Sequence, residues 1–198
     1  MSRTIDIIGL DPSLSNFGSV TARLDIDTLE ILVEAMTVVT TEAEKDKAKR
    51  KVVRKNSEDL DRAATLHDGV TELVKGRVIA FVEVPVGSQS ARAMVSYGVS
   101  LGVLAAVRAR LPMIQVTPTE VKLAGCGIKT ATKEEMIEAM VDKYPNAPWP
   151  MQVVKGVRKP IASKCEHIAD ALAAIEAGIK TDEFRGMINM FRAIPKAA

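Results

Sequence analysis

Three acidic residues stand out because each lies in or beside an apolar segment where a charge is unexpected. Asp11 follows the apolar run Ile7–Leu10, Glu83 lies near the end of a second apolar segment, and Asp170 lies in an alanine-rich one. A carboxylate buried alone is costly, so it protonates, pairs or binds a cation. If the three acids converge, they repel one another, and divalent cations with oxygen ligands resolve that repulsion. Two such ions about 4 Å apart can activate water and stabilise a leaving oxygen in phosphoryl transfer.

A histidine lies near the third acid at a spacing that suggests a shared role. His167 precedes Asp170 by three residues, which places both on one face of a helix. Ala171 and Ala174 share that face and would let the helix lie flat on a sheet, with His167 and Asp170 aimed at the strand ends that carry the other two acids. Each motif alone has a simpler interpretation, a capped turn after a strand or a solvated helix face. Their combination predicts one site.

Size and composition indicate one globular domain. With 198 residues, of which 47% are hydrophobic, the chain can bury one sizeable core, and we expect a single domain over residues 1–198. It contains no run of eighteen apolar residues and no signal-peptide pattern, so we expect no membrane span and a cytoplasmic location. The two cysteines, Cys126 and Cys165, fit a reducing compartment better than a disulfide or zinc framework.

Positive charge is concentrated in two stretches, although the net charge is only +2. Lys45–Lys55 holds seven basic residues and one acid, and Lys155–Lys164 holds four basic residues and no acid. Such stretches on a near-neutral chain fit a protein that binds a polyanion on one face. A solvated helix face explains the first stretch equally well. If both bind DNA, the contacting residues are Lys49, Arg50, Lys51, Arg54, Lys55, Lys155, Arg158 and Lys159.

The order of predicted elements indicates an α/β fold with a mixed sheet. Three strands in an antiparallel meander come first, at Ile5–Leu10, Ser19–Leu24 and Glu30–Val39. Later segments predict the following elements: a helix over Thr40–Lys75, a central strand over Val78–Val84, a helix over Ser88–Leu111, a strand over Met113–Val116, helices begun by Pro118 and by Thr132 with its capping-box partner Glu135, a loop over Tyr144–Pro150, and a helix over Ser163–Lys180 with Glu166 as capping-box partner.

Two of these helices carry apolar faces that need an explanation. The first has an apolar stripe formed by Leu60, Ala63, Ala64, His67, Val70, Leu73 and Val74, and we interpret His67 as a packed structural residue. The helix over Ser88–Leu111 is apolar nearly all round, so one face covers the sheet and the other needs a partner. We predict a subunit contact there, formed by Met94, Val95, Gly98 and Gly102.

Four motifs, in this order, resemble the RuvC family of Holliday junction resolvases, which belong to the ribonuclease H-like superfamily. They are IGLDPSLSNFG, FVEVP, PTEVK and EHIADALAAI, and the resemblance spans about Ile5–Ile179. It implies a ribonuclease H-like fold with a five-stranded mixed sheet flanked by helices, a homodimer, and metal-dependent resolution of four-way DNA junctions by paired symmetric nicks.

The resemblance also assigns roles to individual residues. Lys122, in PTEVK, and Lys133 match two basic positions near the family's active site. Two Mg²⁺ ions, or Mn²⁺ as the alternative that an imidazole ligand makes plausible, would be held by Asp11, Glu83, His167 and Asp170.

The chain departs from the compact cellular members at several places. Where those often carry an aromatic residue just after the strand-four Glu, this chain has Val86. The stretches Lys45–Lys55 and Trp149–Lys164 are additions that resemble phage-encoded relatives more closely.

Three other functions compete with junction resolution. A nuclease for flaps or other branched or single-stranded DNA and a non-catalytic DNA-binding module would both have the same fold. A phosphotransferase of the actin and sugar-kinase superfamily needs two such domains and a second glycine-rich phosphate turn, and this sequence shows neither.

Overall fold

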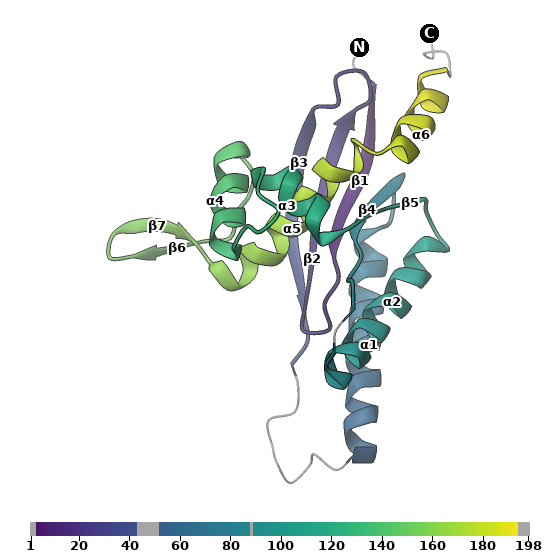
Figure 1. The fold of residues 1–198 in the computed structure, drawn as a ribbon, viewed down its shortest axis with the longest axis vertical. Helices are drawn as coiled ribbons and strands as arrows, with labels where there is room; N and C mark the ends of the chain where they lie inside the picture. Colours follow the sequence, from purple (N-terminus) through teal and green to yellow (C-terminus); the bar gives the residue numbers. More distant parts are fainter. Residues whose placement is uncertain (1–2, 43–51, 88, 194–198) are drawn as a thin grey trace.

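A five-stranded mixed sheet forms the centre of the protein, in the order β3-β2-β1-β4-β5 (Figure 1). The computed structural model describes residues 3–42, 52–87 and 89–193. Strand β1 pairs antiparallel with β2 and parallel with β4, so the α/β fold with a mixed sheet is confirmed. The five strands are β1 (Thr4–Asp11), β2 (Asn16–Asp25), β3 (Ile31–Thr40), β4 (Ile79–Glu83) and β5 (Met113–Val116).

Helices cover both faces of the sheet, and a separate hairpin projects from the body (Figure 1). Within the described residues, no helix combines the length and the apolar character needed to cross a membrane. The helices are α1 (Val52–Leu73), α2 (Ala91–Arg108), α3 (Pro118–Cys126), α4 (Lys133–Lys143), α5 (Ala162–Gly178) and α6 (Asp182–Ala193), and the hairpin strands are β6 (Met151–Val154) and β7 (Val157–Pro160).

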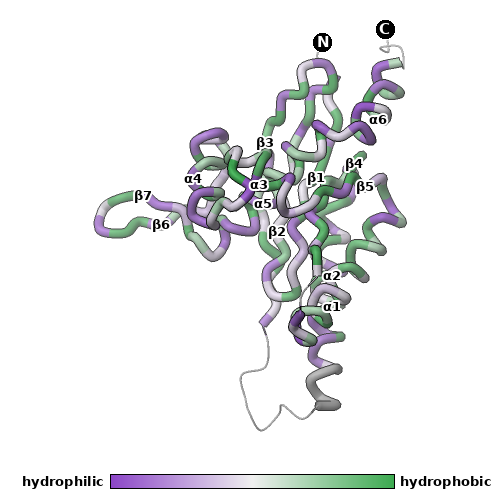
Figure 2. Tube along the Cα trace, in the orientation of Figure 1, coloured by the Kyte–Doolittle hydropathy of each residue, from purple (hydrophilic) through white to green (hydrophobic). Residues whose placement is uncertain are grey.

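The central strands are apolar on both faces because each face lies under a helical layer. Ile7 and Phe81 belong to the core on the side of α5, whereas Ile8 and Val82 belong to the core that α1 and α2 cover. Successive residues of a strand point to opposite faces, so a continuous apolar run serves both cores. The hydropathy colouring of Figure 2 shows these strands as largely hydrophobic in the middle of the molecule.

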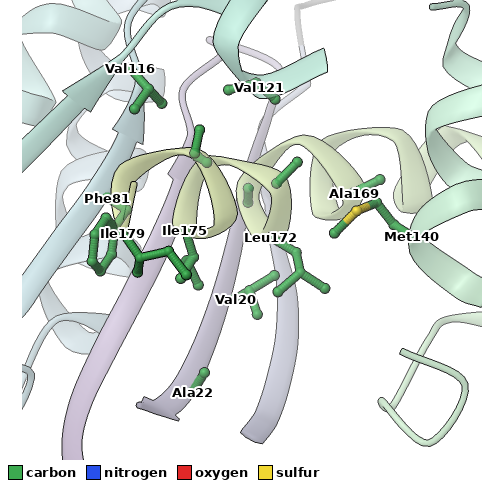
Figure 3. Packing of buried hydrophobic residues seen from close by; sticks show 14 of the residues in the cluster. Val20, Ala22, Phe81, Val116, Val121, Met140, Ala169, Leu172, Ile175 and Ile179 are labelled. Atoms are coloured by element: carbon green, nitrogen blue, oxygen red, sulfur yellow. The ribbon is translucent and has the colours of Figure 1, made fainter. Parts of the chain in front are cut away.

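Helix α5 is buried on almost every side and is the central helix of the first core (Figure 3). Ala169 faces Met140 of α4, and Ala173 lies against α3 at Gly125. The small alanine side chains of α5 let neighbouring elements approach from several directions, so α5 packs against the sheet, α3 and α4 at once.

Two glycines of the sheet let the backbone of α5 approach very closely. A Cβ atom at Gly9 of β1 would lie 2.1 Å from the carbonyl oxygen of Ala171, and one at Gly18 of β2 would lie 2.3 Å from that of His167. Both distances are too short for real atoms, so only glycine allows this packing. The helix therefore lies flat on β1 and β2, as the alanines predict.

The buried face of α1 differs from the predicted stripe. Leu66 and Val70 are buried, but Leu60 is 70% exposed. The side chain of His67 is 41% exposed and pairs with Asp68, so the interpretation of a packed histidine is wrong. The true face also contains the charged residues Asp59 and Arg62, which are buried because other elements supply their partners. A stripe chosen by the spacing of apolar residues leaves out charged residues, so the predicted buried face of α1 was shifted around the helix from the true one.

Three further boundaries differ from the sequence prediction. Strand β3 continues to Thr40, where a helix was expected, and the described part of that helix begins at Val52. Helix α5 follows Ile161 without a side-chain cap, so the predicted capping box with Glu166 is wrong. The added stretch Trp149–Lys164, for which no strand was predicted, contains the β6–β7 hairpin, and α6 was not predicted.

We expect Gly9→Ala to lower the free energy of unfolding by about 1–3 kcal/mol, the usual cost of overpacking a core. The clash is with a backbone carbonyl, which cannot rotate away as a flexible side chain can. Gly186→Ala is the matched control, because it lies in α6 with nothing within 4 Å of an added Cβ, and alanine favours helix. Urea unfolding should show opposite signs for the two variants. An unchanged midpoint for Gly9→Ala would contradict the close packing.

Candidate active site

Asp11 and Glu83 lie side by side at one edge of the sheet. Each is the last residue of its strand, and β1 and β4 are parallel neighbours with Leu10 opposite Val82. Parallel strands end at the same edge, so the two carboxylates are brought together by pairing alone. This edge is where ligands commonly bind in α/β sheets.

Helix α5 brings His167 and Asp170 to the same edge. Nδ1 of His167 lies 2.6 Å from Oδ2 of Asp11, and the two side chains are only 16% and 14% exposed. Gly18 is the register partner of Asp11 in β2, and its missing side chain leaves room for the backbone of His167. The predicted convergence of these residues is confirmed by their positions.

The four residues line a cleft of about 360 Å³. Lys133 also lines it, from the first turn of α4. Lys122 does not, although its charge acts on the two buried acids. Val86 lines the cleft and is 78% exposed. The full lining is Asp11, Pro12, Glu83, Pro85, Val86, Tyr97, Pro118, Lys133, Glu166, His167 and Asp170.

Glu166 is a site residue that the sequence analysis missed. Its Oε1 lies 3.2 Å from Nε2 of His167, and its Oε2 lies 2.9 Å from Nζ of Lys133. Glu166 therefore holds the lysine of α4 beside the histidine of α5. Its spacing of four residues from Asp170 was the available signal, because residues at i and i+4 share a helix face.

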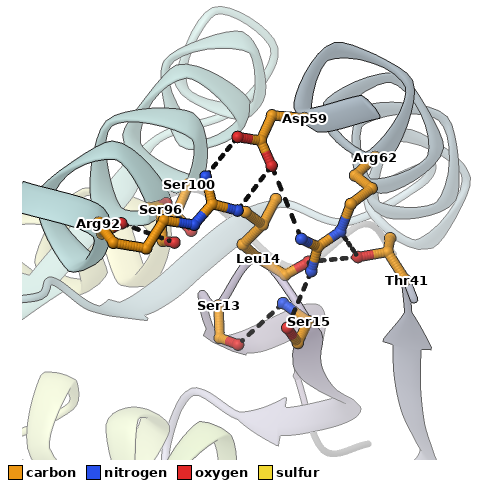
Figure 4. Close-up of polar contacts among 9 residues, drawn as sticks. All are labelled: Ser13, Leu14, Ser15, Thr41, Asp59, Arg62, Arg92, Ser96 and Ser100. Carbon is orange, nitrogen blue, oxygen red and sulfur yellow. Dashed lines mark hydrogen bonds and ion pairs between the residues drawn. The ribbon is translucent and has the colours of Figure 1, made fainter. Parts of the chain in front are cut away.

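A buried ionic cluster fixes the turn that follows Asp11 (Figure 4). Arg62 donates to the carbonyl oxygen of Leu14 at 3.3 Å and to Oγ of Ser15 at 2.9 Å. Asp59 lies 3.7 Å from Arg62 and accepts two hydrogen bonds from Arg92 of α2, one of them at 2.8 Å. Helices α1 and α2 are thereby tied to the loop at the mouth of the site.

The carboxyls of the site are electrostatically destabilised in their charged forms. Burial, followed by repulsion from Asp11 and Asp170, raises the pKa of Glu83 to about 8, although Lys122 opposes this. Burial and the charge of Asp11 likewise raise the pKa of Asp170 to about 7, against the opposing charges of His167 and Lys122. Burial alone would lower the pKa of His167, but its hydrogen bond to Asp11 and the surrounding negative charges raise it.

The donor set fits a hard divalent cation in chemistry rather than in preformed geometry. Carboxylate oxygens with one imidazole suit Mg²⁺ or Mn²⁺, and the raised carboxyl pKa values indicate acids that a nearby cation would stabilise. Among the described residues, however, no three His, Cys, Asp or Glu side chains are arranged as a ready metal site. In this arrangement the carboxylate of Asp11 is engaged by the imidazole of His167, 2.6 Å away.

The other predicted binding residues lie away from this cleft. Lys155, Arg158 and Lys159 are exposed on the β6–β7 hairpin. Lys49, Arg50 and Lys51 lie outside the described residues, and so do the side chains of Arg54 and Lys55. The predicted contact face of α2 is exposed, and its members are Met94, Val95, Gly98 and Gly102.

Comparison with known proteins finds similar folds among solved structures. No family model matches the chain, and no curated protein matches it in sequence. It is similar to RuvC of Thermus thermophilus, solved in complex with a Holliday junction substrate, with a TM-score of 0.59, 22% identity, and 87% of this chain and 92% of that chain covered. A second RuvC structure from the same organism gives a TM-score of 0.58 at 22% identity, covering 93% and 96%.

A viral protein shares the same arrangement at lower similarity. The Fowlpox virus resolvase, solved with Holliday junction DNA, matches with a TM-score of 0.50 and 12% identity, over 94% of this chain and 98% of that chain. The chain therefore has the fold of the RuvC-type resolvases, and the resemblance predicted from four sequence motifs is confirmed at the level of the fold.

The raised carboxyl pKa values predict an unusual pH dependence of stability, best measured in EDTA. A carboxyl whose pKa is higher in the folded state than in the unfolded state contributes stability at low pH that is lost as the pH rises through the folded pKa. We expect Glu83→Gln to gain stability relative to the parent between about pH 4.5 and pH 8, because Gln carries no charge there. Urea unfolding at several pH values measures the difference. A difference that is constant with pH would contradict a destabilised Glu83.

Proposed function

We propose that this protein is a metal-dependent endonuclease that resolves four-way DNA junctions. The observation that carries the proposal is the convergence of Asp11, Glu83, His167 and Asp170 in one cleft. The shared fold supports it, because two similar proteins were solved with Holliday junction DNA. The direct test is cleavage of matched four-way, three-way, flap and duplex DNA, with and without Mg²⁺ or Mn²⁺, and with the product ends mapped.

The roles of the site residues follow from their chemistry. Asp11, Glu83, His167 and Asp170 would hold two divalent ions, which when bound supply activation of water and stabilisation of the leaving oxygen. The residues of the chain position the scissile phosphate and balance its charge. By the family resemblance, the products carry 5′-phosphate and 3′-hydroxyl ends, so symmetric nicks can be ligated directly.

Two lysines supply positive charge beside these acids. Glu166 holds Lys133 at 2.9 Å, at the rim of the cleft, and the charge of Lys122 acts on Glu83 and Asp170. In the proposed reaction these side chains stabilise negative charge on the phosphate in the transition state, so their loss lowers the cleavage rate more than the affinity.

A second candidate, cleavage of other branched DNA, is favoured by one observation. Val86 occupies the place where cellular relatives of this type often carry an aromatic residue, and it is a small apolar side chain exposed at the cleft. If Val86 does not open the junction centre, flaps and three-way structures are cut as efficiently as four-way junctions.

Paired nicking requires two equivalent sites, which a two-fold homodimer supplies. The outer face of α2 is the proposed contact, because Met94, Val95 and Leu101 are 47%, 49% and 45% exposed. Gly98 and Gly102 lie on the same face, with no atom within 4 Å of an added Cβ. Small residues between exposed apolar side chains let a second helix approach closely.

We expect Asp11→Asn to abolish cleavage of a four-way junction while the protein still folds and binds it. Removing one negative charge from the cleft reduces repulsion of the phosphate backbone, so affinity should be unchanged or higher. Gel assays of nicking and of binding in EDTA measure the two effects separately. Asp6→Asn, near the other end of β1, is the matched control and should cut normally. Wild-type nicking by Asp11→Asn would refute the site.

We expect Gly98→Leu to weaken the dimer without unfolding the subunit. The position is open within one chain, so the larger side chain meets only the partner, at a cost of about 1–3 kcal/mol if the contact is tight. Light scattering at micromolar concentration should show a dimer for the parent and more monomer for the variant, which should make single nicks in place of paired ones. A parent that stays monomeric even with junction bound would rule out this assembly.

A further inference from the structure

The β6–β7 hairpin is held at its base and projects away from the body (Figure 1). The amide of Ile161 donates to the carbonyl oxygen of Pro150 at 2.9 Å, which closes the base. Trp149, 5% exposed, anchors it from below. In contrast, every residue from 152 to 159 is exposed. The two strands pair only with each other, and Met151 at the base packs against the core on the side of α5, whereas the residues beyond it belong to neither core.

Three valines on this hairpin face water. Val153, Val154 and Val157 are 74%, 41% and 54% exposed, and Val154 pairs directly with Val157 next to the turn. As register partners, Val154 and Val157 share one face of the ribbon, whereas Val153 points to the other. Valine favours strands, but threonine would do so while presenting less apolar surface to water. A pair of exposed apolar side chains on one face of a projecting element marks a binding surface. Figure 2 shows hydrophobic and hydrophilic residues beside one another near the outer end.

The charges on the hairpin indicate what kind of partner it binds. Lys155, Arg158 and Lys159 lie among the valines, and no acidic residue occurs between Met151 and Cys165. Arg158 is the register partner of Val153 and lies beside it on one face, while Lys159 lies on the other face with Val154 and Val157, so each face carries basic and apolar side chains together. Basic side chains without acidic neighbours favour a negatively charged partner, and the exposed valines need an apolar surface to contact. Duplex DNA offers both, because its phosphates are negative and its grooves expose apolar parts of the bases, so it fits the hairpin better than a protein surface does.

The dimensions of the hairpin suit the major groove. Each strand has four residues, which extend about 13 Å at about 3.3 Å per residue. The major groove of B-DNA is about 12 Å wide and about 8.5 Å deep and admits a two-stranded ribbon. The outer end of the hairpin is therefore long enough to reach base edges while its basic side chains reach the phosphates on either side.

We propose that the β6–β7 hairpin is a DNA-binding arm that lies in the major groove of one duplex arm of the substrate, with Val154 and Val157 against base edges and thymine methyl groups. The inference rests on the proposed function and extends it to a second contact with DNA. The hairpin leads directly into α5, whose second turn carries Glu166 and His167. DNA held by the arm is thus positioned relative to the cleft through one continuous segment.

The turn of the hairpin allows charge to be removed without changing its shape. Lys155 and Gly156 have φ angles of 50° and 78°, the positive values that a two-residue type I′ turn requires. Lys155→Asn creates Asn-Gly, the sequence most favoured in that turn, so the variant Lys155→Asn/Arg158→Gln/Lys159→Gln keeps the hairpin and loses three positive charges. The variant Val154→Thr/Val157→Thr keeps side-chain shape and strand preference but replaces two methyl groups with hydroxyls.

Binding of the full-length protein to a synthetic four-way junction, followed by fluorescence anisotropy in EDTA over a range of salt, tests the inference. The threonine variant should bind about three- to tenfold more weakly with an unchanged salt slope. The charge variant should lower the slope of log Kd against log salt by about two to three. Met190→Gln, which removes an apolar side chain 74% exposed on α6, is the control and should bind like the parent.

A junction in which every thymine is replaced by uracil identifies the groove. Loss of the major-groove methyl groups should weaken the parent more than the threonine variant. A threonine variant that binds like the parent, or an equal loss for both proteins on the uracil junction, would overturn the inference. If the parent binds and cuts junctions while both hairpin variants behave like it, only this inference fails. A parent that binds no branched DNA would overturn the proposed function as well.

Discussion

Helix α5 lies with its backbone against β1 and β2 because Gly9 and Gly18 present no side chains there. This contact fixes both the depth of the helix and its rotation, since a helix that touches a sheet through its backbone cannot roll without a clash. His167 reaches Asp11 at 2.6 Å only from this position. The packing of α5 and the geometry of the cleft are therefore one constraint, and a change at Gly18 would alter both.

The charges around this contact form a second constraint on the structure. Asp11, Glu83, Glu166 and Asp170 line a single cleft, and His167 and Lys133 offset them only in part. Burial, together with this excess negative charge, raises the pKa of both Glu83 and Asp170. On the other side of the sheet the balance is reversed, because two guanidinium groups, those of Arg62 and Arg92, surround the carboxylate of Asp59. That cluster holds the turn after Asp11. An ion-paired group of residues therefore supports the cleft, in which negative charge is in excess.

Sequence reasoning identified the parts of this structure in which a residue differs clearly in type from its neighbours along the chain. Asp11 and Glu83 were recognisable as charges ending apolar strands, and Pro118 and Thr132 as helix starts. Gly127 ends α3 in a left-handed conformation, with φ of 77°, as a glycine there suggests. Features that depend on distant partners were missed or misplaced.

Three cases show why such features escaped prediction. Asp59 and Arg62 look like surface residues of α1, but Arg92 and the turn at Leu14 satisfy them, and this moves the buried face of the helix. Glu166 looked like a capping residue because its spacing from Ser163 fits that motif, whereas Lys133 is its actual partner. The strands of the β6–β7 hairpin have only four residues each, and their outer residues touch neither core, so neither length nor periodicity revealed them.

The arrangement separates two tasks that conflict electrostatically. A cleft rich in carboxylates attracts cations but repels a phosphate backbone, so under the proposed function the affinity for DNA would come from elsewhere on the molecule. Within the described residues, the hairpin with Lys155, Arg158 and Lys159 provides positive charge on a separate projecting element, joined to α5 by Ile161. Distance from the acids keeps these basic side chains from pairing with them, which leaves them available to phosphates. Under the proposed function, the short connection from the hairpin into α5 would let DNA bound at the hairpin be positioned relative to the cleft.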